Sequence, residues 1–368
     1  MTQHIPNTVP ENPLGILGND RLLERLTRDI RDNRLSHAYI LDGKPGSGRH
    51  TLARHMAAAI ACYHRPGRIL PHDSEDQMGF FDDEDTAPLL SEDASVPCGI
   101  CEGCRKVLEG ISPDVILIGR EGKASLGIDA VRRIKETVHL APGEADIKVY
   151  IIEDAETMTL QAQNALLLTL EEPPAYVLFI LLCNGVENLL ETIRSRAPVL
   201  HTAPVSDELI KEYLIAHKRS LPSAELDALL ICADGSIGQA LALSDAKSVK
   251  SILKQRELTD AFIEGAAHRR KAAIPAVIGQ FGNKRDEVLG LLSLLTLAVR
   301  DLMLLKKCET AKLKYYTQRD TALALTEAMT SRTLLSLFKA LEQAKDELMR
   351  NGNVRLTLTQ MCFAAGVL

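Results

Sequence analysis

Residues 43–50 read GKPGSGRH and have the outline of a phosphate-binding loop, G-x-x-x-x-G-K-[ST]. The loop follows an apolar run, His37–Leu41, and precedes a helical pattern with Leu52, Met56 and Ile60 on one face. This order of strand, loop and helix is the setting that the motif requires. Its glycines let backbone N–H groups turn toward phosphate oxygens at the N-terminus of a helix, where the macrodipole also favours anions. The sequence therefore predicts a nucleotide-type fold around this loop.

The loop departs from the motif at its last two positions. Arg49 stands in place of lysine, and a planar guanidinium is not a conservative replacement for a compact ammonium. His50 stands in place of the serine or threonine whose hydroxyl ligates Mg²⁺, and imidazole is a poor ligand for this hard cation. We expect a degenerate loop that keeps its binding geometry but lacks parts needed for hydrolysis. The residues expected to form it are Gly43, Gly46, Gly48, Arg49, His50 and Thr51.

The composition indicates a multi-domain intracellular protein. A chain of 368 residues with 46% apolar residues is long enough for two or three domains with ordinary cores. The longest apolar runs, such as Val177–Cys183, suit a buried strand and are too short for a membrane span of about 20 residues. The first ten residues lack the apolar region of a signal peptide. Eight cysteines, three of them in one cluster, suit a reducing compartment, so we expect a cytoplasmic protein without membrane contact.

An acidic block dominates the net charge of −6. Residues 69–104 contain no Lys or Arg and include nine acids between Asp73 and Asp93, so that the rest of the chain carries −6 + 9 = +3. The block has a one-signed charge and little apolar periodicity, which predicts a disordered insertion over about residues 65–97. An acidic segment that binds a partner is the alternative.

The order of apolar runs and helical patterns predicts an α/β fold with a parallel sheet covered by helices on both faces. After Pro204 the strand patterns stop and only helical patterns follow. We expect a nucleotide-fold domain over residues 1–205, a small helical lid over 206–248 and a larger all-helical domain over 249–368. The runs expected to be strands are His37–Leu41, Val115–Ile118, Val149–Ile152, Val177–Leu182 and Pro198–His201.

Two acids follow the third of these runs. Glu153 and Asp154 end the run Val149–Ile152, as in the Walker B pattern, where one carboxylate holds Mg²⁺ and the other orients the attacking water. The usual order is Asp then Glu, and here it is reversed. A displacement of about 1 Å at a reacting centre can cost on the order of 10²-fold in rate. A solvated turn gives the same pair of acids, but the preceding loop favours the nucleotide-site interpretation.

Three cysteines lie within seven residues, at Cys98, Cys101 and Cys104. This spacing lets a turn wrap three thiolates around a tetrahedral Zn²⁺. A ferredoxin run would need a fourth cysteine at position 108, where Leu108 stands, so zinc is preferred to an iron–sulfur cluster. Three or four protein thiolates leave no open catalytic position, which indicates a structural site.

Three further motifs give the chain a family resemblance. Residues 163–174 read QNALLLTLEEPP, residues 192–197 read TIRSRA and residues 35–39 read LSHAY. Together with the cysteine cluster they resemble the clamp-loader branch of the AAA+ ATPases, and within it the delta-prime and gamma/tau subunits of bacterial DNA polymerase III. The resemblance covers about residues 13–245 by specific motifs and the remaining helices by pattern only. It implies an AAA+ domain, a helical lid and a C-terminal collar domain.

The resemblance also implies roles for single residues. Ser195 and Arg196 match the family's Ser-Arg-Cys motif, whose arginine reaches into the ATP site of the neighbouring subunit, although Ala197 departs from the motif. Such an arginine stabilises charge on the transferring phosphoryl group. A helix-end arginine in a surface salt bridge is the alternative.

Two positions near the loop complete the comparison. Asn184 falls near the polar sensor 1 residue, within one position. Gly238 falls where active subunits carry the sensor 2 arginine, so one cation that would stabilise a γ-phosphate is missing. Together with Arg49, His50 and the reversed acids, the missing arginine leads us to expect that the isolated chain does not hydrolyse ATP.

The family also has a fourth zinc-binding cysteine upstream of the cluster. The candidate here is Cys62, which makes residues 62–104 the zinc module, with His64 and His72 as rival ligands. The long gap between Cys62 and Cys98 is tolerable because loop-closure cost grows only logarithmically with length.

The resemblance implies a subunit without ATPase activity of its own, and ATP binding stays open. Its expected partners are gamma/tau and delta subunits, the beta sliding clamp and, through the complex, primed DNA. One alternative is an active gamma/tau-type ATPase, which an ATPase assay on the isolated chain would reveal. Another is a zinc-dependent nucleic-acid-binding protein on an AAA+ scaffold, which strong and salt-dependent DNA binding by the lone chain would support.

Overall fold

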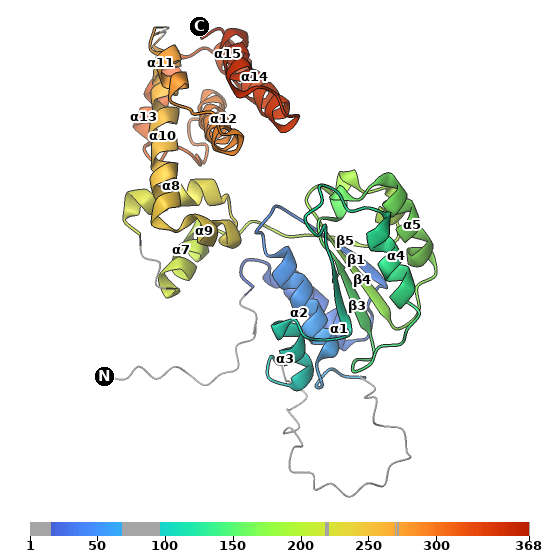
Figure 1. Ribbon diagram of the computed structural model, residues 1–368. Helices are drawn as coiled ribbons and strands as arrows, with labels where there is room; N and C mark the ends of the chain where they lie inside the picture. The colour runs from blue at the N-terminus through green and yellow to red at the C-terminus, as the bar shows by residue number, and fades with distance from the viewer. Residues whose placement is uncertain (1–15, 68–95, 218–220, 269, 271, 368) are drawn as a thin grey trace, which may run out of the picture. The chain divides into compact units, whose positions relative to one another are not determined.

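The computed structural model describes residues 16–67, 96–217, 221–268, 270 and 272–367 (Figure 1). Most of the expected acidic insertion and His72 lie outside these residues. The chain forms two compact units. The first comprises Met1–Ile210 with Gly235–Gly238, and the second comprises Lys211–Asp234 with Gln239–Leu368. The predicted domain boundaries at 205 and 248 stay predictions.

The first unit is built on a five-stranded parallel sheet with the order β2-β3-β4-β1-β5. This confirms the α/β prediction, and each strand lies within one residue of a predicted run. Apolar side chains fill β3 and β4 almost without interruption, as expected for strands that are covered on both faces. The strands are β1 (Ala38–Asp42), β2 (Val115–Ile118), β3 (Lys148–Ile152), β4 (Val177–Cys183) and β5 (Val199–His201).

Helices cover both faces of the sheet. On one face α1 (Asp20–Arg31) and α2 (Arg49–Ala61) pack against alternate residues of the central strands. On the other face α4 (Ile128–Thr137) and α5 (Leu160–Glu171) bury the remaining alternate residues, including Tyr150. Figure 1 shows the two pairs on opposite sides of the sheet. This alternation follows from the two-residue period of a strand, which points successive side chains to opposite faces.

All five strands run in one direction, so their carboxyl ends lie along a single edge. The loop after β1, the acids after β3, the residues after β4 and the end of β5 therefore meet at this edge. Ligands of open parallel sheets bind outside the carboxyl ends of the strands. The shorter elements of this unit are α3 (Glu102–Glu109), α6 (Glu191–Arg194), and the 3₁₀ turns η1 (Ala155–Thr157) and η2 (Val186–Asn188).

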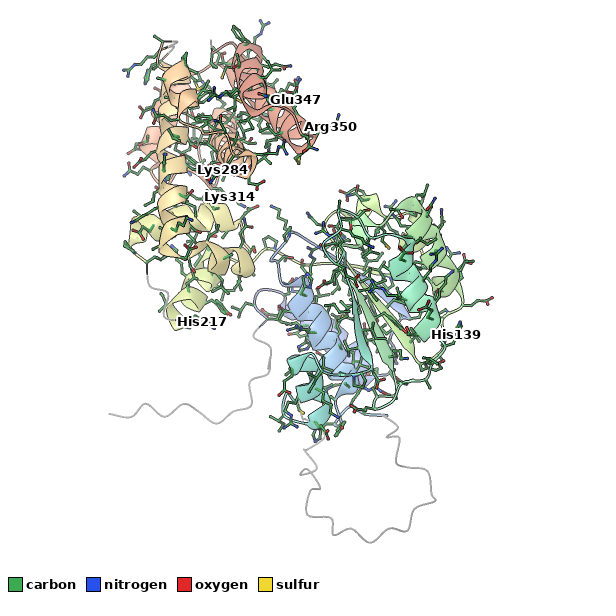
Figure 2. All side chains as sticks on the ribbon, viewed as in Figure 1. His139, His217, Lys284, Lys314, Glu347 and Arg350 are labelled. Atoms are coloured by element: carbon green, nitrogen blue, oxygen red, sulfur yellow. The ribbon has the colours of Figure 1, made fainter. Side chains whose placement is uncertain are left out.

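The second unit is helical, as predicted, and its core lies between α10, α12, α14 and α15. Asp301 on α12 is fully buried, and its Oδ2 accepts the backbone N–H groups of Lys314 and Tyr315 at 2.8 and 2.7 Å, which ties the long loop after α12 to the core. The Lys314 ammonium, labelled in Figure 2, pairs with Asp234. The helices after β5 are α7 (Asp207–Ala216), α8 (Ser223–Ala233), α9 (Ile237–Leu243), α10 (Ala246–Ala267), α11 (Ile274–Gly279), α12 (Arg285–Lys307), α13 (Arg319–Ala328), α14 (Ser331–Met349) and α15 (Val354–Ala365).

Helix α12 is apolar for a reason of packing. Within the described part of the chain it is the one helix whose length and mean hydropathy of 2.0 would suit a membrane span, and 56% of that window is buried inside the protein. It contacts α10, α13 and α14. Its composition therefore fits the central helix of a helical core.

Candidate functional site

The phosphate loop leaves β1 and enters α2 as the sequence predicts. Gly46 and Gly48 have φ of 75° and 90°, in the left-handed region that glycine adopts without strain, and Gly48 immediately precedes α2. The Gly43 N–H donates to the Cys183 carbonyl at 3.1 Å, which joins the loop to the end of β4. The Ser47 hydroxyl lies 2.7 Å from that of Thr202, just beyond β5. The loop is thus anchored to both neighbours of β1.

Arg49 occupies the lysine position but is buried. Only 5% of the residue is exposed, and among the described residues its Nε and Nη1 atoms have no hydrogen-bond partner. Burial raises the pKa of the nearby Cys183 thiol to about 12, and the positive charge of Arg49 acts in the opposite direction. The guanidinium is therefore close to the end of β4, on the same edge as the loop.

His50 and the two acids after β3 form a contact that the sequence did not reveal. The imidazole Nδ1 of His50 lies 3.0 Å from Glu153 Oε1, so the side chain at the magnesium-ligand position lies within ion-pair distance of the carboxylate expected to hold the metal. Asp154 has φ of 48°, and its Oδ2 accepts Nε and Nη2 of Arg120 at 2.9 and 2.8 Å. Both acids are therefore occupied by basic side chains. Thr51, the next residue of α2, is half-buried.

Asp42, at the end of β1, is a further acid of this edge that sequence reasoning missed. Its Oδ1 accepts the Gly185 N–H at 3.0 Å, and its Oδ2 lies 3.0 Å from His201 Nδ1. Its place directly before the loop was visible in the sequence, but its partners lie more than 140 residues away. Asn184, the expected sensor 1 residue, follows β4 at this edge, is exposed and bonds to none of the described side chains.

Gly238 contacts the phosphate loop directly. Its N–H lies 3.4 Å from the Gly46 carbonyl, and a Cβ placed on Gly238 would come within 3.2 Å of the Gly46 Cα. The same segment is held at Gly235, whose carbonyl accepts the Val205 N–H at 2.8 Å. Glycine at the sensor 2 position thus does more than remove a cation, because it also allows the backbone at Gly238 to approach the backbone at Gly46.

Arg196 lies two residues beyond the end of α6. It is distant in sequence from the phosphate loop of its own chain, and its hydrogen-bond partners are not in that loop. Its Nη2 bonds to Glu171 Oε1 at 2.7 Å and its Nη1 to the Thr192 carbonyl at 2.9 Å. The side chains of Arg196 and Glu171 are 34% and 45% exposed, so the pair lies at the surface. Ser195 donates its hydroxyl to Thr192 at 3.0 Å, which caps the short helix. Exposed pairs of this kind are weak, typically about 0–1 kcal/mol, and can exchange for another partner.

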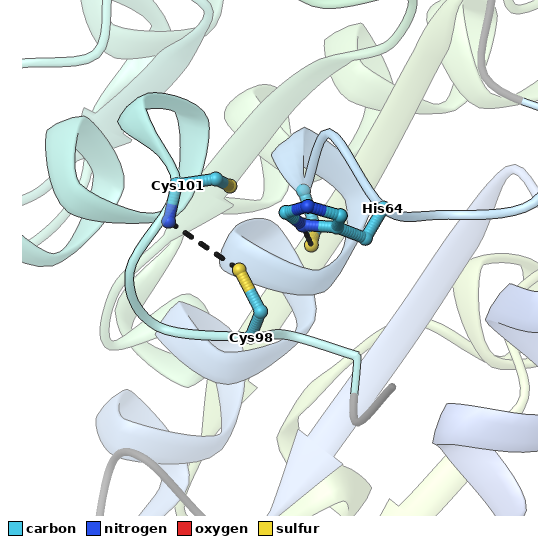
Figure 3. Close-up of side chains that lie close together, drawn as sticks. His64, Cys98 and Cys101 are labelled. Carbon is cyan, nitrogen blue, oxygen red and sulfur yellow. Dashed lines mark hydrogen bonds between the residues drawn. The ribbon is translucent and has the colours of Figure 1, made fainter. Parts of the chain in front are cut away.

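The cysteine cluster folds into one compact group. Cys98 and Cys101 approach Cys62 from the turn before α3, and Figure 3 shows His64 beside them. The ligand atoms of Cys62, His64, Cys98 and Cys101 all lie within 4.8 Å of one another. Cys104 joins the group from α3, with its Sγ 4.0 Å from that of Cys98. Sequence reasoning named all five residues, and the structure brings all of them together.

The geometry and chemistry of this cluster fit zinc. Zn–S bonds of about 2.3 Å in a tetrahedron place two sulfur atoms about 3.8 Å apart, close to the separation of Cys98 and Cys104. The N–H groups of Cys101 and Cys104 point to the sulfurs of Cys98 and Cys101 at 3.4 Å, an arrangement that favours thiolates. The hydrogen bond with Cys104 lowers the pKa of Cys101 to about 6. The cluster can thus hold Zn²⁺ with Cys62, Cys98, Cys101 and either Cys104 or His64.

Comparisons with known proteins place this chain among similar sequences. Residues 86–206 match the family model described as DNA polymerase III, delta subunit. The chain is 28% identical to the tau/gamma subunit of Haemophilus influenzae DNA polymerase III over 64% of this chain and 31% of that protein. It is 33% identical to the delta-prime subunit of the Escherichia coli enzyme over 60% of this chain and 58% of that protein. The chain thus spans about a third of the first relative and under two thirds of the second. These matches support membership of the clamp-loader family of bacterial DNA polymerase III subunits.

Proposed function

We propose that this chain is a delta-prime-type clamp-loader subunit, which hydrolyses no ATP itself and contributes Arg196 to the ATP site of a neighbouring subunit. The observation that carries the first half is the contact between His50 and Glu153 at 3.0 Å. In an active site of this type, a hydroxyl and a carboxylate would face Mg²⁺. Here an imidazole stands in place of the hydroxyl and lies beside the carboxylate, which supports a site that does not hold Mg²⁺.

Two further features support the loss of hydrolysis. Asp154 is engaged by Arg120, so the second acid is not free to orient water. Gly238 supplies no cation, and its contact with Gly46 leaves little room for a larger side chain. Each loss removes a group that would stabilise the transition state or position a reactant, and such losses act on the chemical step.

The position of Arg196 supports the second half of the proposal. The Arg196 side chain is one-third exposed and pairs with a surface carboxylate, Glu171. Exchange of that weak pair for a phosphate of a neighbouring subunit would cost little. An arginine delivered to a transferring phosphoryl group is worth about 10³ to 10⁵ in rate in well-studied GTPases. The surface salt bridge can therefore be a resting position of a group that works in trans.

The zinc module completes the proposal as a structural element. Zn²⁺ held by Cys98, Cys101, Cys104 and Cys62 would tie the turn before α3 to the end of α2, and it would have no open coordination position. The relatives are named as DNA polymerase III subunits, which supports assembly with other subunits of that enzyme. We propose gamma/tau and delta subunits as the partners, the beta sliding clamp and primed DNA as the targets of the complex, and the cytoplasm as its location.

An ATPase assay separates the proposal from an active gamma/tau-type motor. We expect the purified chain to hydrolyse ATP at background rate, and the double variant Arg49→Lys, His50→Thr to stay inactive because Asp154 and Gly238 are unchanged. A turnover near about 1 s⁻¹ by the isolated chain would favour the active motor. Tight DNA binding by the isolated chain, falling steeply with salt, would instead favour the nucleic-acid-binding alternative.

A further inference from the structure

The connection between α12 and α13 is a basic surface on a chain that is acidic overall. Residues 306–319, which we call the basic loop, read KKCETAKLKYYTQR. They carry five cations and one acid, a net charge of 5 − 1 = +4, while the whole chain carries −6. A local concentration of one sign of charge attracts ligands of the opposite sign whatever the net charge of the protein.

A buried acid holds the backbone of the basic loop in place. Asp301 on α12 is fully buried, and its Oδ2 accepts the N–H groups of Lys314 and Tyr315 at 2.8 and 2.7 Å. The Tyr315 hydroxyl, from a residue that is 1% exposed, donates to Asp260 on α10 at 2.7 Å. A buried carboxylate is costly unless its hydrogen bonds are made. These contacts therefore fix the path of the loop across the helical core.

The fixed backbone turns the apolar side chains inward and the lysines outward. Leu313 packs against the core and Tyr315 is buried in it, while Lys312 and Lys314 between and before them are exposed. Lys314, labelled in Figure 2, pairs with Asp234. The loop thus presents its charges to solvent from an ordered backbone.

Three cations of the basic loop are free for a partner. Lys306 and Lys307, in the last turn of α12, and Lys312 are exposed, and no acid among the described residues forms an ion pair with them. Lysines in the last turn of a helix also complement its macrodipole, but that effect leaves their ammonium groups in solvent. Lys312 lies outside any helix. An anionic ligand can therefore meet three ammonium groups without breaking an existing ion pair.

The composition of this surface favours a nucleic acid over an acidic protein. Apart from its cations the loop exposes no large apolar side chain, since Leu313, Tyr315 and Tyr316 are all at least partly buried. The cores of protein interfaces are enriched in aromatic residues and arginine and depleted of lysine. Contacts to a phosphodiester backbone need only cations and polar groups.

We propose that the basic loop contacts the phosphate backbone of DNA without sequence preference. The family resemblance gives the helical domain a role in assembly alone, so this contact is a further function of that unit. The inference rests on the proposed function for the choice of DNA as the polyanion, and it deepens that function by naming a surface that meets the DNA.

Fluorescence anisotropy of the full chain with labelled DNA tests the inference. A single strand and a duplex of the same length are each titrated at several salt concentrations between about 50 and 200 mM. We expect weak, saturable binding in the range of about 10⁻⁶ to 10⁻⁴ M that is typical of non-specific contacts. The tighter of the two DNA forms identifies which part of primed DNA the loop meets.

Variants locate the surface. Replacing the three free lysines with glutamine should weaken binding by about tenfold or more, and it should reduce the slope of log affinity against log salt by about 2 on a single strand. The matched control removes the same charge from three exposed lysines of the same unit and should bind as the unaltered chain does. The loop variant is Lys306→Gln, Lys307→Gln, Lys312→Gln, and the control is Lys247→Gln, Lys250→Gln, Lys339→Gln.

Four results overturn the inference. They are no binding of either DNA at about 50 mM salt, undiminished binding by the loop variant, an equal loss in the control variant, and displacement of the DNA by polyglutamate at equal charge concentration. The third would show an effect of net charge alone, and the fourth would assign the loop to an acidic protein. Each titration uses the lone chain, so these outcomes are independent of whether Arg196 acts in trans.

Discussion

At the scale of single residues, the chain shows how substitutions in a motif are absorbed by new partners. His50 lies 3.0 Å from Glu153, and Arg120 pairs with Asp154. The substitutions could be identified from the sequence, because a motif specifies the residue type expected at each position. The sequence did not identify Arg120 as the partner of Asp154 or Glu171 as the partner of Arg196. These partners come from loops and helix ends, and their approach depends on the whole fold.

A buried histidine gives a prediction about pH. His55 on α2 is 3% exposed, and burial lowers its pKa to about 4 from an ordinary value of 6.5. Between these values the unfolded chain binds a proton that the folded chain does not, so stability falls as the pH drops from about 6.5 to 4. The loss reaches about 3 kcal/mol. Chemical denaturation of His55→Phe should show a flatter pH dependence over this window. His139→Gln, at an exposed site labelled in Figure 2, should match the unaltered chain, and an unchanged slope in His55→Phe would contradict the expectation.

At the scale of elements, the strands and long helices were predictable and the contacts between them were not. Val115–Ile118 was predicted without error, because a short uninterrupted apolar run suits a strand of a parallel sheet, although only Ile118 of β2 is buried. The contact between Gly238 and the phosphate loop was not visible, since in sequence Gly238 only marked a missing arginine. A close approach of two backbone segments leaves no pattern in the sequence other than the glycine that permits it.

That contact predicts an unusual glycine substitution. Gly238→Ala should lower the stability of the chain by about 1 kcal/mol, because the new Cβ meets Gly46 Cα at 3.2 Å. Gly279→Ala, in α11 with open space around the new methyl, should instead raise stability by up to about 1 kcal/mol. Denaturant titration of both proteins is the measurement. Equal gains in the two variants would mean that the loop contact does not constrain Gly238.

The cysteine cluster predicts metal content at the same scale. Protein purified under reducing conditions without chelator should carry close to one zinc per chain by elemental analysis. Cys98→Ser should lose most of it, and Cys308→Ser, an exposed cysteine of the second unit, should keep it. Zinc retained at full affinity in Cys62→Ser would assign the fourth position, beside Cys98, Cys101 and Cys104, to His64. Absence of zinc in the unaltered chain would remove the metal altogether.

At the scale of the whole molecule, two compact units divide the proposed work. The first holds the altered phosphate loop, the cysteine cluster and Arg196, and the second is a helical unit with its own core. The fold class could be predicted because strand runs end at Pro204 and helical periods continue. The burial of Arg49 could not be predicted, since the loop motif specifies its place in the sequence but not how much of the residue the fold covers.

The most direct test is the ATPase rate of a reconstituted complex with gamma/tau, delta, the beta clamp and primed DNA, in which this chain carries Arg196→Ala. We expect the complex to assemble and to show a lower kcat with nucleotide binding little changed, because a group that acts in the transition state is lost. Arg196→Lys should rescue poorly, since an ammonium lacks the planar fork of guanidinium. Glu171→Gln, which removes the surface partner alone, should not lower the rate. An assembled Arg196→Ala complex with unchanged ATPase and clamp-loading rates would contradict the account, because Arg196 would then be a surface residue paired with Glu171.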